Sequence, residues 1–194
     1  MPDFLQVDNA LMFRGSNRYP RSFGLVIRLC LHFGVTPVFI PIAEPWRNGV
    51  IESFNSTYDK KFYRSQWFAS YATLKRQSKN FQRFHNRFHR YSCLKGKTPL
   101  EEIEALGDSP LLLPAATKLP KLDHIPDGQI IAIRFIRSDR QMDIFSEKFK
   151  VPKELVYTYV KAVIDTSNHS LAVYQGDHFV MAFEYRLPSG ERNS

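Results

Sequence analysis

Residues 45–55 read Pro-Trp-Arg-Asn-Gly-Val-Ile-Glu-Ser-Phe-Asn, and they join a short loop to the start of an amphipathic helix. At about 100° per residue, Val50 and Phe54 advance along one face of this helix, whereas Glu52 lies on another face. Taken alone, Glu52 is most simply an acidic residue on a solvated surface. The segments before and after this stretch give Glu52 a second interpretation, as a carboxylate held for binding.

Positive charge is concentrated around this stretch. The chain of 194 residues has a formal net charge of +8 and a pI near 9.5, which favours an acidic partner, nucleic acid before an anionic membrane. Between Glu44 and Lys97 there are 12 Lys or Arg and 3 Asp or Glu, so the rest of the chain sums to −1. We therefore expect a local basic surface with DNA as its partner.

Cysteine usage and the N-terminus bear on the compartment. Only Cys30 and Cys93 are present, and neither has a second cysteine nearby at zinc-binding spacing. The first residues lack the basic region and apolar core of a signal peptide, and no apolar run is long enough to span a membrane. We expect a cytoplasmic protein with no membrane partner.

The first hundred residues show strand and helix patterns in alternation. Apolar runs at residues 4–7 and 35–40 are typical of strands, with a helix predicted between them. Pro37 indicates an edge strand or a strand start. The Glu52 helix is predicted to run to about residue 65, and Ser70 begins another helix. The basic side of that second helix suits DNA and a solvated surface equally well.

The last ninety residues have a different pattern. Residues 107–127 are rich in proline and are predicted to form an extended linker. Residues 128–188 contain five short β-rich runs separated by turns, which is typical of a small closed barrel. Residues 189–194 are expected to be a polar, disordered tail. The predicted domains are therefore residues 1–106, the linker, and residues 128–188.

Two carboxylates are candidates for a joint site. Asp8 ends the first predicted strand, and Glu52 opens the helix that follows the second. If the two strands are parallel neighbours, these side chains can meet. Carboxylate oxygens suit Mg²⁺, and with a third carboxylate they could hold two ions about 3.5 to 4 Å apart that align an attack on phosphorus.

Three segments in this order resemble the DDE transposase and retroviral integrase core. Residues 7–13, Val-Asp-Asn-Ala-Leu-Met-Phe, are similar to the D-N-G-x-x-F segment that holds the family's second aspartate. Residues 34–41 followed by 44–55 look like the stretch that leads into its catalytic glutamate. Residues 84–99 are similar to the ending Y-N-x-x-R-x-H … L-x-G-x-T-P of bacterial insertion-sequence members. Residues 127–188 resemble, more weakly, the β-barrel that follows the core in Mu-type transposases.

The resemblance implies a ribonuclease H-like fold in which three carboxylates bind Mg²⁺, or Mn²⁺, and catalyse strand transfer into DNA. Carried over by position, Asp8 is the second catalytic carboxylate and Glu52 the third, and both are metal ligands. The family also implies a bacterial, nucleoid-associated protein. The predicted DNA contacts, taken from the motif and the basic window, are Arg47, Asn48, Asn55, Lys60, Arg64, Lys75, Arg76, Lys79 and Arg83.

The sequence also departs from the family pattern. The family's first aspartate, with the strand hairpin that bears it, has no counterpart in these residues, and Ala10 replaces the usual glycine. The expected fold class is α/β plus all-β, with a partial ribonuclease H-like core of two strands and three helices followed by a five-stranded barrel. Because the strand at residues 4–7 pairs with the first strand in the family fold, its outer edge is expected to be bare.

The predicted function is that of the C-terminal portion of a DDE transposase or integrase. Such a protein binds transposon ends and target DNA for transposition or DNA integration, and this portion is expected to be inactive alone. Self-association, or pairing with an N-terminal transposase fragment, is expected at the bare edge. Two alternatives stay open: a Mg²⁺-dependent strand-transfer enzyme complemented by that fragment, and a non-catalytic regulator of transposition.

Overall fold

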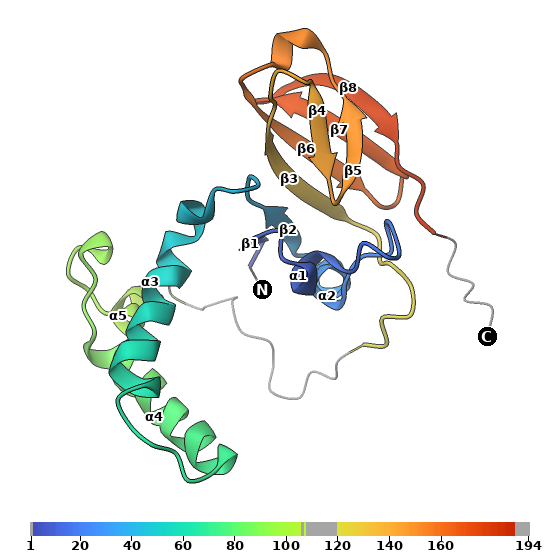
Figure 1. Ribbon diagram of the computed structural model, residues 1–194. Coiled ribbons are helices and arrows are strands. Elements are labelled where there is room, and N and C mark those ends of the chain that lie inside the picture. Colours follow the sequence, from blue (N-terminus) through green and yellow to red (C-terminus); the bar gives the residue numbers. More distant parts are fainter. Residues whose placement is uncertain (1, 106, 108–119, 189–194) are drawn as a thin grey trace. The chain divides into compact units, whose positions relative to one another are not determined.

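The computed structural model describes residues 2–105, 107 and 120–188 (Figure 1). These residues form two compact units. The sheet unit contains the residues up to Asn48 together with those from 120 onward, and the helical unit runs from Gly49 to 107. No helix in the described part of the chain is long and apolar enough to cross a bilayer.

The sheet unit is built on one six-stranded mixed sheet. The first two strands run parallel, which is the condition set above for Asp8 and Glu52 to meet, and the second is also parallel to the third. The remaining neighbours are antiparallel. In spatial order the strands are β1 (Phe4–Val7), β2 (Thr36–Phe39), β3 (Gln129–Phe135), β6 (Tyr159–Asp165), β7 (Ser170–Gln175) and β8 (His178–Glu184).

Short elements cover this sheet. The strands β4 (Gln141–Ile144) and β5 (Glu147–Lys150) form a separate antiparallel hairpin. Two helices, α1 (Leu11–Arg14) and α2 (Leu25–His32), lie between β1 and β2 in the sequence. A side chain at Gly128 would bring its Cβ to 2.9 Å from Leu31, so α2 approaches the start of β3 closely.

A single hydrophobic core joins the two ends of the chain. Ile27 of α2 and Phe39 of β2 are fully buried in the same cluster as Ile130 of β3 and Leu171 of β7. The hairpin contributes Met142 to this cluster. Because burying one such side chain stabilises a fold by roughly 1.5–3 kcal/mol, the cluster binds the N-terminal strands and the C-terminal strands into one unit.

The helical unit contains α3 (Gly49–Tyr58), a π-helical turn (Asp59–Tyr63), α4 (Tyr71–Phe88) and α5 (Pro99–Ala105). The Ser70 hydroxyl accepts a hydrogen bond from the Thr73 N–H and caps α4, as predicted. Phe62 is buried here, with its ring centroid 5.0 Å from that of Tyr58 and 5.3 Å from that of Phe81. The unit is therefore held by aromatic packing between α3, the π turn and α4.

Several details of the predicted fold are wrong. The described part of residues 1–106 contains five α-helices and not three, because Leu11–Arg14 and Pro99–Ala105 each form a short helix. Residues 128–188 contain six strands and not five. In the additional strand, Glu147–Lys150, three of the four residues are charged, and it follows β4 after a turn of only two residues, so its pattern merges with that of the turn. A closed barrel is not shown among the described residues, since β1 and β8 end the sheet order and the hairpin is a separate ladder.

The division into units follows different lines from the predicted domains. The described strands of residues 1–48 share a sheet and a core with the predicted barrel, while the boundary between units falls at Asn48 and Gly49. Most of the predicted linker and the whole predicted tail lie outside the described residues. The predicted domain limits therefore stay a prediction.

Candidate functional site

Asp8 lies at the end of β1 in a turn fixed by its neighbour. The exposed Asp8 carboxylate accepts a hydrogen bond from the Ala10 N–H, at 2.8 Å. The Asn9 side chain donates to the Ile40 carbonyl at 2.7 Å, which ties the end of β1 to the end of β2. Ala10 has φ −61° and ψ 143°, an ordinary extended conformation, so the turn does not require glycine at this position.

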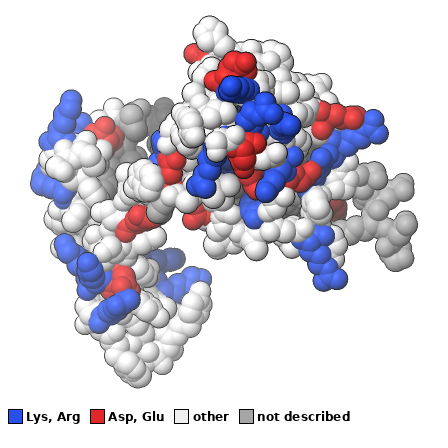
Figure 2. Space-filling model, turned by 45° about the horizontal axis from the view of Figure 1, so that its top comes forward, with Lys and Arg blue, Asp and Glu red and all other residues white. Residues whose placement is uncertain are grey.

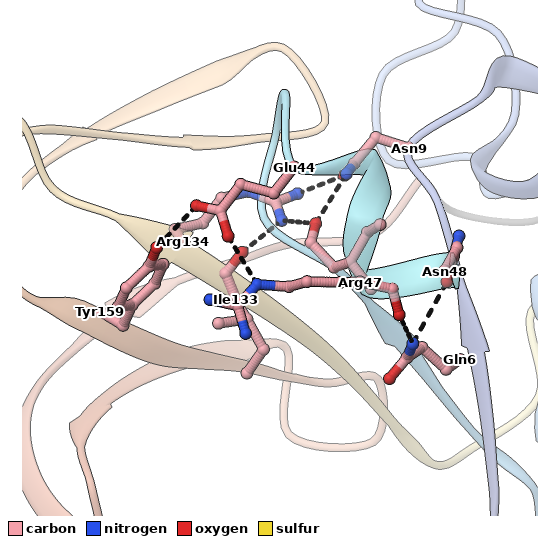
Figure 3. Close-up of polar contacts among 9 residues, drawn as sticks. Gln6, Asn9, Glu44, Arg47, Asn48, Ile133, Arg134 and Tyr159 are labelled. Atoms are coloured by element: carbon pink, nitrogen blue, oxygen red, sulfur yellow. Dashed lines mark hydrogen bonds and ion pairs between the residues drawn. The ribbon is translucent and has the colours of Figure 1, made fainter. Parts of the chain in front are cut away.

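Arg134 of β3 is the buried centre of this turn (Figure 3). Its guanidinium donates to the Asn9 side-chain oxygen at 2.8 Å and to the Ile40 carbonyl at 3.2 Å. It also donates to the carbonyls of Ile133 and Asp143, at 2.8 and 2.6 Å. Burial lowers the pKa of Arg134 to about 10, against a smaller opposing effect of the Asp143 carboxylate. The group therefore stays charged at neutral pH, with mostly neutral acceptors around it.

The loop that leads to the Glu52 helix is held from both sides. The Gln6 side chain donates to the Arg47 carbonyl at 2.9 Å and to the Asn48 side-chain oxygen at 3.2 Å. On the other side the Tyr159 hydroxyl donates to Glu44 at 2.8 Å (Figure 3). Arg47 pairs with the same carboxylate and lies over the Tyr159 ring, 4.9 Å from its centroid. The hydrogen bonds from Arg47 and Tyr159 lower the pKa of Glu44.

Glu52 lies in the first turn of α3, in the helical unit, with its side chain exposed. Asp8 belongs to the sheet unit, so a joint site of the two carboxylates stays a prediction. Among the residues that the structure describes, no group of three or more His, Cys, Asp and Glu side chains is placed to hold a metal ion. Two exposed carboxylates do not make up the three-carboxylate set expected for Mg²⁺ or Mn²⁺, so we derive no metal-dependent step.

The predicted DNA contacts fall into two groups. Arg47 and Asn48 lie in the sheet unit and take part in the loop contacts described above. In the helical unit Arg64 pairs with Asp59 at 2.7 Å. The other six side chains are exposed on α3, the π turn and α4: Asn55, Lys60, Lys75, Arg76, Lys79 and Arg83.

We call the four residues Lys75, Arg76, Lys79 and Arg83 the basic face of α4. Residues 49–113 carry +5 of the net charge of +8 in one third of the chain. In Figure 2 blue side chains outnumber red ones over the helical unit, while both colours alternate over the sheet unit. The helical unit is therefore the more strongly basic surface.

Sequence reasoning missed Arg134 and Tyr159 as residues that fix the loops next to Asp8 and Glu44. One signal was available, since Arg134 interrupts the apolar run Ile-Ile-Ala-Ile-Arg-Phe-Ile and a charged residue inside a strand needs internal partners. Tyr159 carried no such signal, because a tyrosine at the start of a strand is common.

Two histidines and a tyrosine, His85, His89 and Tyr91, pack together at the C-terminal end of α4. His85 is buried, and its Nε2 lies 2.8 Å from the Tyr91 hydroxyl. Its ring stacks on that of His89, with 4.6 Å between the centroids. Burial, and then repulsion from His89 and Lys61, lowers the pKa of His85.

We expect the helical unit to lose stability as the pH falls from 7 to 5. His85 has its ordinary pKa in the unfolded chain and a lower one in the fold, so the unfolded state takes up the proton first. Above about pH 6.5 His85 is neutral in both states and the free energy of unfolding keeps its full value. Below that pH the unfolded state binds the proton more strongly, so the free energy of unfolding falls. Thermal unfolding followed by circular dichroism would show this, and a His85→Gln variant should flatten the dependence. An unchanged pH dependence in that variant would contradict the assignment.

Residues 33–99 match the family model of the integrase core domain. The matched segment covers about a third of the chain, including α3 with Glu52 and α4 with its basic face. No curated protein matches the chain. The match supports the predicted relationship to integrases and transposases, whose core has a ribonuclease H-like fold and acts on DNA. Asp8 and the strands from β3 onward lie outside the matched segment.

Proposed function

We propose that this protein binds DNA as the C-terminal portion of a DDE transposase or integrase, in transposition or DNA integration. The observation that carries the proposal is the basic face of α4, which lies exposed within the segment similar to the integrase core domain. Phosphate binding by several Lys and Arg side chains gives strong, sequence-independent affinity for DNA. The ligands are transposon ends and target DNA.

Asp8 and Glu52 are proposed as the second and third carboxylates of the ancestral catalytic site. Both side chains are exposed, so an ion can reach either of them. A complete site needs a third carboxylate, so the chain alone is expected to be inactive. The two remaining possibilities, an enzyme complemented by an N-terminal fragment and a non-catalytic regulator, differ in whether a Glu52→Gln substitution abolishes strand transfer in the complemented protein.

DNA affinity is expected to fall steeply with salt. A protein that neutralises about 6 to 10 phosphates loses roughly 10³ to 10⁵ in affinity between 50 and 200 mM salt, because it releases bound counterions. Fluorescence polarisation of a labelled duplex, measured at four or more salt concentrations, gives the slope. An affinity that hardly changes over this range would count against the proposed function.

The outer edge of β1 is the proposed site of self-association or of pairing with a transposase fragment. β1 stands at the end of the sheet order, and Phe4 is 61% exposed. The backbone N–H groups of Thr36 and Ile40 donate to the carbonyls of Asp3 and Val7. The backbone N–H and C=O groups of the odd-numbered residues of β1 therefore point to β2. The Phe4 N–H therefore points to the free edge, where a carbonyl of an added strand can accept a hydrogen bond from it.

A Phe4→Pro variant is expected to abolish strand addition at this edge without loss of a β1–β2 hydrogen bond. Proline removes the outward N–H, whereas the matched Phe4→Ala variant removes only the side chain. Light scattering of the two variants and the wild type, with and without a fragment that carries the family's first strand, measures association. A wild type that is monomeric and does not bind the fragment would contradict the proposal.

A further inference from the structure

The sheet unit contains a cavity that has no role in the proposed function. This cavity, of about 440 Å³, lies between the loop after β2 and the β3–β4 region. Its lining includes Trp46 from the loop, Phe135 and Arg137 after the buried Arg134, and Lys148 of β5. Trp46 is 67% exposed and Phe135 is 39% exposed. Two large aromatic side chains therefore stand half open to water on the wall of one cavity.

The Phe135 part of this aromatic wall is held in place by its neighbours. The Phe135 ring packs against Tyr159, with 5.1 Å between the centroids. Tyr159 is in turn fixed by its hydrogen bond to Glu44 and by the Arg47 guanidinium over its ring. A side chain that is held on its far side keeps its free face in place, and an exposed aromatic face stacks readily on a planar ligand.

Two exposed cations of the cavity lining, Arg137 and Lys148, can bind an anion beside that planar group. Three acids are in the lining, and each already has a partner. Glu44 is bound by Arg47 and Tyr159, while Asp139 and Asp143 accept the backbone N–H groups of Gln141 and Ser146. In the described part of the chain no ion pair involves the side chains of Arg137 or Lys148, and both are exposed. Asp139 and Asp143 keep their negative charges, so the lining carries both signs, and Arg137 and Lys148 are its exposed cations without an ion pair among the described residues.

We propose that this cavity binds one unpaired nucleotide, with its base against the Trp46 and Phe135 rings and its phosphate beside Arg137 and Lys148. An aromatic face with nearby cations is the arrangement that proteins use for unpaired bases. The volume admits a single nucleotide and no duplex. The proposal goes beyond duplex binding by the basic face of α4, because it needs none of the residues of that face.

The two tryptophans of the chain make a direct test possible. A Trp67→Phe background leaves Trp46 as the only tryptophan, so its fluorescence reports on the cavity alone. A thymidine hexanucleotide should quench this fluorescence with saturation. Phe135→Ala should weaken binding roughly 5- to 150-fold, the value of one base–aromatic stack. Arg137→Gln, an exposed substitution that leaves the packing intact, should also weaken it.

Phe179→Ala is the matched control, since Phe179 is an exposed aromatic residue of β8 that does not line the cavity. Saturable quenching by thymidine monophosphate as well as by the hexanucleotide supports a site for a free nucleotide. Quenching by the hexanucleotide alone supports a site for a DNA strand. Absence of quenching by both, or equal effects of Phe179→Ala and Phe135→Ala, would overturn the proposal. Quenching that persists after neutralisation of the basic face of α4 separates this site from the proposed function.

Discussion

An Asn9→Leu variant is expected to unfold with a free energy about 3 kcal/mol lower than that of the wild type. The Asn9 side chain donates to the Ile40 carbonyl and accepts from the Arg134 guanidinium, so leucine removes both hydrogen bonds. A hydrogen bond to a charged group contributes roughly 1.5–3 kcal/mol, and a neutral one roughly 0.5–1.5 kcal/mol. Arg134 is buried and mostly surrounded by neutral acceptors, so the loss of one acceptor is not compensated by water.

Urea denaturation followed by circular dichroism measures this loss. The matched variant is Asn9→Asp, which keeps an acceptor for Arg134 and adds a full negative charge, while it loses the donor to Ile40. We expect its stability to lie between those of Asn9→Leu and the wild type. An Asn9→Leu variant within about 0.5 kcal/mol of the wild type, the range of ordinary surface substitutions, would show that the buried guanidinium does not depend on this acceptor.

The parts of the fold that were predicted correctly are those with local causes. Ser70 caps α4 because its hydroxyl reaches the N–H three residues later, which the sequence specifies by itself. The strands at Phe4–Val7 and Thr36–Phe39 follow from apolar runs, and the helix between them allows the parallel pairing that the structure has. Pro37 shows the same locality, since β3 pairs only with Val38 and Phe39, beyond the residue that lacks an N–H.

The parts that were missed depend on contacts distant in sequence. Nothing near Ile131 or Ala132 indicates that β3 pairs with Val38 and Phe39, about ninety residues earlier. This pairing places Arg134 of the C-terminal strands against Asn9, next to one candidate carboxylate. The position of Glu52 in the first turn of a helix was predictable because it is local. The surroundings of Asp8 were not, because Arg134 supplies them from the other end of the chain.

The largest functional effect is expected from neutralising the basic face of α4. Replacing Lys75, Arg76, Lys79 and Arg83 together by glutamine removes four positive charges with little change in helix propensity. If each side chain neutralises one phosphate, the slope of log affinity against log salt becomes shallower by about 3.6. If wild type and variant bind equally at about 1 M salt, this difference in slope predicts a loss of affinity on the order of 10³ at 100 mM salt.

A second variant with the same charge change provides the control. Lys121, Lys150, Lys153 and Arg186 are exposed in the sheet unit, and none of them lines the cavity or belongs to the integrase-like segment. Their joint replacement by glutamine removes the same charge from the chain. If both variants lose equal affinity and slope, DNA binding follows net charge and not a defined surface. If only the α4 variant does so, the phosphate contacts are localised to the segment that resembles the integrase core. In that case the cations of the sheet unit release no counterions from the DNA.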